Sequence, residues 1–300
     1  MPSKILITGG TGLVGTKLTD ELLAKNHEVR ILTTSALRAE EEDAFYWNLK
    51  DQYIDQRAFE GLDYIVHLAG AGVADKRWSE ERKKVIYDSR IKNTALLCER
   101  AKGHGVKGII AASAIGYYGF DTGDELMTEE SERGDGFLSD VVVDWEREVE
   151  EFERIVDHVM MVRIGIVLST EGGALKQMAP PFKLGVGSPL GNGKQWMSWI
   201  HIDDLVGMII HGLENNSSGI FNAVAPNPER NKDFSKTLAT SLNRPMWLPN
   251  VPAFILKIVF GELAQVVLGG NRVSAKKIVD AGYSFKFEDL ATALTDLFKK

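Results

Sequence analysis

The residues with the clearest chemical use are three glycines near the N-terminus. Gly9, Gly12 and Gly15 lie three residues apart, between an apolar run expected to form a strand and an amphipathic helix pattern. In that context the first glycine permits a tight turn, the second lets backbone approach a pyrophosphate, and the third allows close helix packing. The helix N-terminus offers N–H groups to phosphates. We therefore predict a dinucleotide-binding turn that contains Gly9, Thr11, Gly12, Leu13, Val14 and Gly15.

The end of the second expected strand indicates which dinucleotide is bound. An acid at this place would bind the ribose hydroxyl of NAD and repel the additional phosphate of NADP. The stretch Leu32–Ser35 carries hydroxyl groups and no acid, and Arg38 follows within reach. We expect Thr33, Thr34, Ser35 and Arg38 to contact that phosphate, so that NADP(H) is preferred over NAD(H). The alternative is that Arg38 only caps a solvated turn.

Composition excludes several other classes of protein. The 300 residues are 44% hydrophobic and 26% charged, with a formal net charge of -7, which argues against binding the phosphate backbone of nucleic acid. The one cysteine, Cys98, cannot form an internal disulfide, and it fits a reducing cytoplasm. No His, Cys or acidic residues have convincing metal-ligand spacing, so we expect no metal. The expected partner is a small-molecule substrate, and a homodimer stays open.

The sequence has no segment that reads as a signal peptide or a membrane span. The N-terminal apolar run is short and ends in glycines. The longest apolar segment, Phe254–Leu268, is interrupted by Lys257, Gly261 and Glu262, and it falls short of the roughly 20 residues that a bilayer span needs. We expect this segment to form a buried or surface-packed helix in a cytoplasmic protein without a membrane partner.

The dinucleotide turn requires a scaffold, and the hydrophobic pattern supplies one. Short β-branched runs alternate with helical patterns, which is typical of parallel βαβ units. The runs are nearly continuous in apolar residues, as expected where helices cover both faces of a sheet. The fold class is therefore α/β with a doubly wound parallel (Rossmann) sheet. The expected strands are residues 4–8, 29–33, 64–68, 108–112 and 159–163.

Three segments together resemble the extended short-chain dehydrogenases: the glycine turn, Asp63–Gly70 and Trp199–Leu205. More narrowly, the chain is similar to an atypical, epimerase-like branch of that family, the NAD-dependent epimerase/dehydratase-like proteins regarded as nucleotide-sugar epimerases of unknown substrate. The resemblance runs from end to end. The segments that carry it are Ala74–Trp78, Ser113–Gly119, Gly134–Leu138, Arg244–Pro249 and Ala281–Phe285.

The resemblance implies further contacts with the cofactor and a division into two parts. A dinucleotide-binding domain would span residues 1–170, with 195–225 returning to it. A smaller, mostly helical domain, residues 171–194 and 226–300, would cap the substrate; in the sequence, glycines and prolines make residues 172–193 rich in loops. The implied cofactor contacts are Asn48 and Leu49 beside the adenine, Leu68, Ala69 and Gly70 along the ribose, and Arg163 at the start of the nicotinamide side.

The catalytic residues of the family are where this sequence departs from the pattern. The family uses a Tyr, a Lys four residues later and a Ser, but Phe137 and Val141 stand at the Tyr and Lys places. A phenyl ring cannot relay a proton. Tyr117 and Tyr118, with Ser113, are the candidate substitutes, although alignment from Tyr118 places the family's Ser on Ala114. The alternative for both tyrosines is aromatic packing.

A cationic and aromatic loop is the candidate for binding substrate. Lys76, Arg77 and Trp78 follow a predicted strand, where they could receive a phosphate-bearing substrate or form a solvated turn. Three functions remain open: an NADP-dependent epimerase or oxidoreductase, a simple reductase of a small carbonyl compound, and an NADPH-binding sensor without Tyr-Lys chemistry. Two further expectations are that His67 is a packed histidine and that Asp203 caps a helix.

Overall fold

An eight-stranded sheet is the centre of the molecule in the computed structural model, which describes residues 2–299. The strand order is β12-β8-β6-β5-β1-β2-β3-β4, and every neighbouring pair is parallel except β3 and β4. This confirms the predicted doubly wound Rossmann fold. The bounds are β1 (Lys4–Thr8), β2 (Glu28–Thr33), β3 (Ala44–Asn48), β4 (Tyr53–Ile54), β5 (Tyr64–His67), β6 (Gly108–Ala114), β8 (His158–Ile164) and β12 (Gly219–Ala223).

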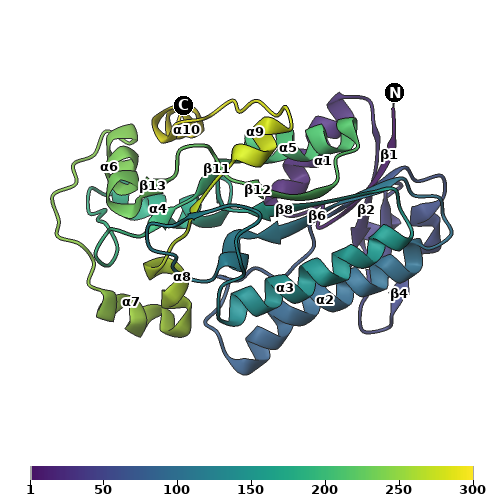
Figure 1. Ribbon diagram of the computed structural model, residues 1–300, viewed down its shortest axis with the longest axis horizontal. Coiled ribbons are helices and arrows are strands. Elements are labelled where there is room, and N and C mark those ends of the chain that lie inside the picture. The colour runs from purple at the N-terminus through teal and green to yellow at the C-terminus, as the bar shows by residue number, and fades with distance from the viewer. Residues whose placement is uncertain (1, 300) are drawn as a thin grey trace.

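Helices cover both faces of the sheet because its strands are apolar on both sides. Successive residues of a strand point to opposite faces, and in β1 Ile5 and Ile7 join one buried cluster while Leu6 joins the other. Helices α1 (Leu13–Ala24) and α5 (Ile202–Asn215) pack in the first cluster, and α2 (Glu80–Ala101) and α3 (Phe137–Glu150) in the second (Figure 1).

The second half of the chain adds short strands, short helices and a third apolar cluster. That cluster joins α4, α6 and α10 through Leu175, Phe182, Phe234, Leu238 and Leu294. The remaining elements are η1 (Arg38–Glu40), η2 (Gln56–Phe59), η3 (Ile115–Tyr118), β7 (Leu126–Met127), η4 (Glu151–Arg154), β9 (Ile166–Leu168), α4 (Gly173–Lys183), β10 (Trp196–Met197), β11 (Trp199–His201), β13 (Glu229–Arg230), α6 (Asn231–Ser241), α7 (Ala253–Phe260), η5 (Gly261–Leu263), α8 (Ala264–Leu268), β14 (Arg272–Val273), α9 (Lys276–Asp280) and α10 (Leu290–Leu297).

The C-terminal region contacts both parts of the molecule. While α6 and α10 build the third cluster, Val273, Ile278 and Tyr283 are buried in the cluster of α1 and α5, against the main sheet. The segment around β14 and α9 is therefore packed on the dinucleotide-binding half, although the sequence places it in the expected cap. The expected boundary at residue 226 does not separate two independent cores.

Two expectations about the second half are wrong in detail. The stretch 172–193, expected as loop, contains α4, because Leu175, Ala179 and Phe182 fall on one face of a helix and are buried. The segment Phe254–Leu268 is not one helix, since α7 ends at Phe260 and the next residue, Gly261, adopts a φ of 62°. Within α7 only Leu256 is buried, so this helix packs on the surface.

The start of α5 also differs from the expectation. The imidazole of His201, not the carboxylate of Asp203, caps this helix, because His201 Nδ1 accepts a hydrogen bond from the N–H of Asp203 at 3.1 Å. Asp203 instead pairs with Lys17 of α1 at 3.3 Å. Among residues 2–299, no helix is both long enough and apolar enough to cross a membrane.

Candidate functional site

The glycine turn between β1 and α1 forms a bare backbone cradle. Gly9 has a φ of 73°, and a Cβ on it would lie 3.0 Å from the backbone nitrogen of Ala69. A Cβ on Gly15 would collide with the carbonyl oxygen of Gly9, whereas one on Gly12 would meet only that oxygen, at 3.2 Å. No side chain caps the N-terminus of α1. The turn therefore leaves backbone N–H groups and open space beside Gly12, which suits a pyrophosphate.

The turn after β2 is ordered by its own hydroxyl groups. Thr33 Oγ1 accepts a hydrogen bond from the N–H of Ser35 at 3.1 Å, and Ser35 Oγ accepts one from the N–H of Arg38 at 3.3 Å. Thr34 is exposed. Glu41 lies 3.6 Å from the guanidinium of Arg38 and would compete with a bound phosphate for it. The four residues expected to contact the phosphate are thus brought together beside the glycine turn.

A buried histidine fixes the segment after β5 against the glycine turn. His67 Nδ1 lies 2.6 Å from Thr8 Oγ1, and His67 Nε2 lies 2.9 Å from Thr94 Oγ1. Thr8 Oγ1 also accepts a hydrogen bond from the N–H of Ala69 at 3.1 Å. Burial, with a smaller contribution from the charge of Arg90, lowers the pKa of His67 to about 4. The expected packed histidine is confirmed, and it positions the Leu68–Gly70 segment.

Asn48 and Leu49, the residues expected beside the adenine, lie at the same edge of the sheet: Asn48 is the last residue of β3, and Leu49 follows it. The side-chain amide of Asn48 donates to Tyr46 Oη at 3.1 Å and to Asp51 Oδ2 at 2.8 Å, and its oxygen accepts from the N–H of Lys50. Leu49 is half-buried. Because the carboxyl ends of parallel strands meet at one edge, the expected adenine, ribose and phosphate contacts share a single side of the molecule.

The structure brings Arg163 into a buried polar network. Its guanidinium donates to both carboxylate oxygens of Glu146 at 2.8 Å and to Tyr118 Oη at 3.1 Å. Ser113 Oγ donates to Glu146 Oε1 at 2.5 Å, and Tyr118 Oη donates to Asn222 Oδ1 at 2.7 Å. Burial raises the pKa of Tyr118 to about 12. The network ties β6, η3, α3, β8 and β12 together.

This network engages side chains that the sequence analysis assigned to chemistry. The hydroxyls of Ser113 and Tyr118 and the guanidinium of Arg163 all bond inside the protein, and the ring of Tyr117 lies with its centroid 3.4 Å from Arg163 Cζ. None of these four residues lines the neighbouring apolar pocket of about 320 Å³. The hydrogen bonds of Ser113 and Arg163 to Glu146 hold β6 and β8 on α3. The sequence spacing of Ser113 and Tyr118 gives no sign of Glu146, because that residue belongs to a separate helix.

An apolar pocket of about 320 Å³, called here the inner pocket, lies where β6, α3 and β8 meet residues 266–271. Arg90 of α2 is the one charged side chain among its lining residues. Ser198 lines it too, but its hydroxyl donates to the carbonyl of Asn271 at 2.7 Å. The apolar lining includes Val73, Ile86, Ala114, Ile115, Leu138, Val141, Val142, Ile164, Ile166 and Val266.

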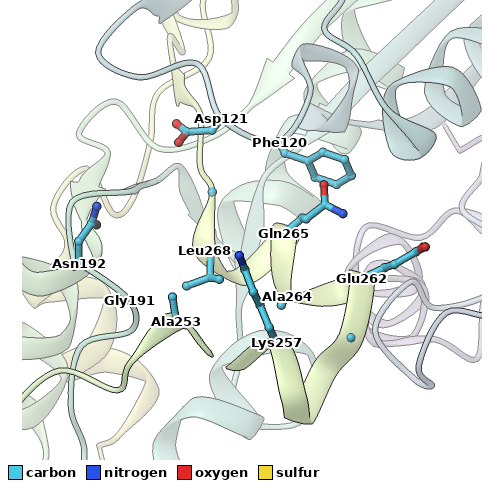
Figure 2. Close-up of a pocket in the computed structure, with 12 residues that line it drawn as sticks. Phe120, Asp121, Gly191, Asn192, Ala253, Lys257, Glu262, Ala264, Gln265 and Leu268 are labelled. Atoms are coloured by element: carbon cyan, nitrogen blue, oxygen red, sulfur yellow. The ribbon is translucent and has the colours of Figure 1, made fainter. Parts of the chain in front are cut away.

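A larger pocket of about 820 Å³, called here the outer pocket, lies between α7, α8 and two loops. Phe120 and Gly269 line both pockets, so the two adjoin. Figure 2 shows Lys257 extending from α7 toward Leu268, with Asn192 approaching from another side. The cleft therefore has an apolar end beside the sheet and a polar, charged end beneath α7.

Sequence comparison matches this scaffold to known proteins. The model of the NAD dependent epimerase/dehydratase family matches residues 5–135, and a domain of unknown function, DUF1731, matches residues 251–297. An epimerase family protein of Staphylococcus aureus is 37% identical over 98% of this chain and 99% of its own length. This chain belongs to the NAD-dependent epimerase/dehydratase family.

Solved structures extend the match for this epimerase-family protein. Human epimerase family protein SDR39U1, crystallised with NADPH, has a TM-score of 0.87 and 31% identity, covering 98% of each chain. A nucleoside-diphosphate sugar epimerase from Corynebacterium glutamicum has a TM-score of 0.79 and 31% identity, with 99% of this chain matching 58% of that one. The family resemblance expected from the motifs is confirmed.

The places of the family's Tyr and Lys are apolar in this epimerase-family protein. Val141, at the place that the resemblance gives to the Lys, lines the inner pocket, and so does Ala114, one of the two residues that could stand at the place of the Ser. Phe137, at the place of the Tyr, packs edge-on against Trp78 with ring centroids 5.2 Å apart. Trp78 Nε1 donates to the carbonyl of Val73 at 3.0 Å. Trp78 is therefore a packing residue next to the inner pocket, and the chain places no Tyr-Lys pair there.

Lys76 and Arg77, like Trp78, are not among the residues that line the inner pocket. Lys76 and Arg77 are exposed, and the guanidinium of Arg77 lies against Gly261 at the start of η5. The sequence analysis missed Arg90 and Lys257, which line the inner and outer pockets. Both stand inside helical sequence patterns, where a cation is ordinarily solvated. Their position at the pockets follows from the packing of α2 against α3 and of α7 against the loops, which the sequence does not indicate.

Proposed function

We propose that this epimerase-family protein binds NADP(H) and transfers a hydride to or from a hydroxyl or carbonyl group of a nucleotide sugar or a related compound. The observation that carries the proposal is the bare cradle of Gly9, Gly12 and Gly15, at the sheet edge beside a small apolar pocket. Human SDR39U1, 31% identical to this chain, was crystallised with NADPH. The nicotinamide, when bound, supplies or accepts the hydride.

The preference for NADP(H) rests on the turn after β2. Thr33, Thr34, Ser35 and Arg38 would hold the additional phosphate, and the stretch Leu32–Ser35 has no acid to repel it. Asn48 and Leu49 would flank the adenine, and Leu68, Ala69 and Gly70 would follow the ribose. Arg163 would support the nicotinamide side indirectly, through the Glu146 pair that fixes β8.

The two adjoining pockets would divide the work on the substrate. The inner pocket would hold the reacting carbon, and the outer pocket, with Lys257 and Asn192, would hold the polar remainder of the substrate. Residues 226–270 would form a cap over this cleft. We assign proton transfer to solvent, because the hydroxyl of Ser198, the one hydroxyl side chain among the residues lining the inner pocket, is engaged with Asn271.

A second candidate function is an NADPH-binding sensor. The observation that favours it is the apolar character of the two places where the family carries Tyr and Lys, namely Phe137 and Val141. Such a protein would bind the dinucleotide without turnover. Binding would alter the packing around the pocket, and a partner protein would respond to that alteration.

The first experiment is a fluorescence titration of the full chain with NADPH and NADH, followed by turnover assays with UDP-sugars and small carbonyl compounds. We expect tighter binding of NADPH. Gly12→Ala should weaken NADPH binding by about tenfold, because the added Cβ would stand between the backbone and the pyrophosphate. The fold should be kept, since Gly12 has extended backbone that alanine adopts and the Cβ meets only Gly9. Thr19→Ala, further along α1, is the control. Binding without turnover favours the sensor, and absence of any dinucleotide binding contradicts both functions.

A further inference from the structure

Arg90 is a largely buried cation that no carboxylate neutralises. It lies in α2 and lines the inner pocket. Its Nη1 donates to the carbonyl oxygens of Ala71 at 3.0 Å and Ile86 at 3.1 Å, and its Cζ lies 5.2 Å from the ring centroid of Trp145. These contacts fix the guanidinium but leave its charge uncompensated, because among residues 2–299 no acid lies within ion-pair distance of it.

Two donors of Arg90, Nε and Nη2, have no partner among residues 2–299. Within the described chain, Nε and Nη2 make no hydrogen bond to another residue, and neither is among the fully enclosed polar atoms that lack a partner. Both atoms therefore keep accessible surface. Arg90 lines the inner pocket, and its Nη2 also lies 3.4 Å from the position that a Cβ on Gly70 would take. Burial, followed by the charge of Arg82, lowers the pKa of Arg90 to about 10, so that the side chain stays protonated at neutral pH.

We propose that the substrate of this protein carries a carboxylate, and that Arg90 binds it in the inner pocket. Nε and Nη2 lie on one edge of the planar guanidinium, and two parallel donors match the two oxygens of a carboxylate. The surrounding lining, including Ala114, Val141 and Ile164, would receive the apolar body of the same molecule. A buried cation without a partner is costly, and a bound carboxylate removes that cost.

The geometry favours a substrate carboxylate over a cofactor phosphate. The glycine turn already supplies backbone donors for the pyrophosphate, whereas Arg90 lines a pocket of about 320 Å³ whose other lining residues are uncharged. The experiment must also test a contact between Arg90 and the cofactor, because a Cβ on Gly70, which is expected along the ribose, would lie 3.2 Å from Arg90 Cζ. The inference rests on the proposed function only in assuming that the reacting carbon occupies the inner pocket.

The experiment measures the binding of benzoate and its neutral analogue benzamide to the full chain saturated with NADP⁺, by calorimetry. We expect benzoate to bind more tightly than benzamide. Arg90→Gln should weaken benzoate binding by at least about tenfold and leave benzamide unchanged, because a charge-assisted bidentate contact is lost. Arg90→Lys should lose less, since it keeps the charge without the planar fork. Lys92→Gln removes an exposed charge from the same helix and is the matched control.

Separate outcomes overturn this inference and the proposed function. Equal affinity of the wild-type chain for benzoate and benzamide would overturn the carboxylate assignment while leaving NADPH binding intact. A loss of NADP⁺ affinity in Arg90→Gln without a change for benzoate would assign Arg90 to the cofactor instead. Ala114→Leu, which fills the inner pocket without altering Arg90, should abolish the binding of benzoate and benzamide alike and so tests the place of binding. If Arg90→Gln does not fold, Arg90→Lys decides the matter, since unchanged benzoate binding in that variant would overturn the bidentate contact.

Discussion

At the scale of single residues, we expect cofactor choice to depend on the charge at the end of β2. Thr34 is exposed beside the hydroxyls of Thr33 and Ser35. We predict that Thr34→Asp weakens NADPH binding by at least about tenfold and leaves NADH binding nearly unchanged, because the new carboxylate repels only the additional phosphate. Parallel fluorescence titrations with the two dinucleotides measure this. Thr34→Asn, equal in size but uncharged, should keep the NADPH affinity, and equal loss in both variants would contradict the assignment.

The same scale shows which roles a sequence can reveal. The roles of Gly9 and Gly15 are local, because each glycine is required by backbone within the same turn or the strand next to it, and the motif predicts them correctly. The engagement of Ser113 is not local. Its hydroxyl bonds to Glu146, 33 residues away, and that carboxylate belongs to a helix whose register against β6 no motif records.

At the scale of elements, the Arg163–Glu146 pair joins β8 to α3 inside the core. The side chains are 2% and 6% exposed, so that removing one partner leaves the other charge buried and unpaired. We predict that Glu146→Gln lowers the free energy of unfolding by about 3–5 kcal/mol. Urea denaturation measures it.

The chain provides a matched control for this prediction in the next residue of the same helix. Arg147 pairs with Asp144 at the surface, where its side chain is 66% exposed. Arg147→Gln should change the free energy of unfolding by less than about 1 kcal/mol, because exposed ion pairs contribute little. Similar losses in Glu146→Gln and Arg147→Gln would show that the buried pair does not hold α3 on the sheet.

His67, which joins β5 to α2, makes stability depend on pH. Its folded-state pKa of about 4 lies below the unfolded value of about 6.5, so protonation favours the unfolded chain. Its contribution is fully present above about pH 6.5 and is lost as the pH falls toward 4. The difference corresponds to about 3 kcal/mol between those limits. Urea denaturation at pH 7 and pH 5 measures the part lost by pH 5, about 2 kcal/mol.

Two histidine variants separate this site from general acid effects. His67→Gln should be less stable than the wild-type chain at pH 7, because it disturbs the hydrogen bonds to Thr8 and Thr94, but it should lose less stability on acidification. His158→Gln, at the half-buried start of β8, should keep the pH dependence of the wild type. An unaltered pH dependence in His67→Gln would exclude His67 as its source.

At the scale of the whole molecule, the sequence predicts the sheet better than the second half. The five expected strands coincide with β1, β2, β5, β6 and β8 within two residues at either end, because each is a continuous apolar run between turns. The second half lacks such runs. Its elements, α4 among them, are helical because they pack on one another, and the return of Val273 and Tyr283 to the main sheet depends on contacts between distant segments.

Asp204 of α5 binds the C-terminal segment, residues 273–287, through hydrogen bonds at its end. Asp204 is fully buried, and its carboxylate accepts hydrogen bonds from Tyr283 Oη at 3.0 Å, from the N–H of Lys286 at 2.7 Å and from the N–H of Phe287 at 3.0 Å. Three donors meet one acidic group, so an amide in its place would turn its own N–H groups toward a donor. The two halves of the molecule are therefore joined through a contact that tolerates only an acceptor.

We predict that Asp204→Asn lowers the free energy of unfolding by about 2–4 kcal/mol, because it leaves a buried donor unpaired and loses charge-assisted bonds. In the wild-type chain, circular dichroism and tryptophan fluorescence should report one coincident urea transition, since the C-terminal segment shares the core of the main sheet. Asp203→Asn, which alters only the partly exposed pair with Lys17, should cost less than about 1 kcal/mol. Two separate transitions in the wild type, or equal effects of the two variants, would mean that the C-terminal segment folds independently of the sheet.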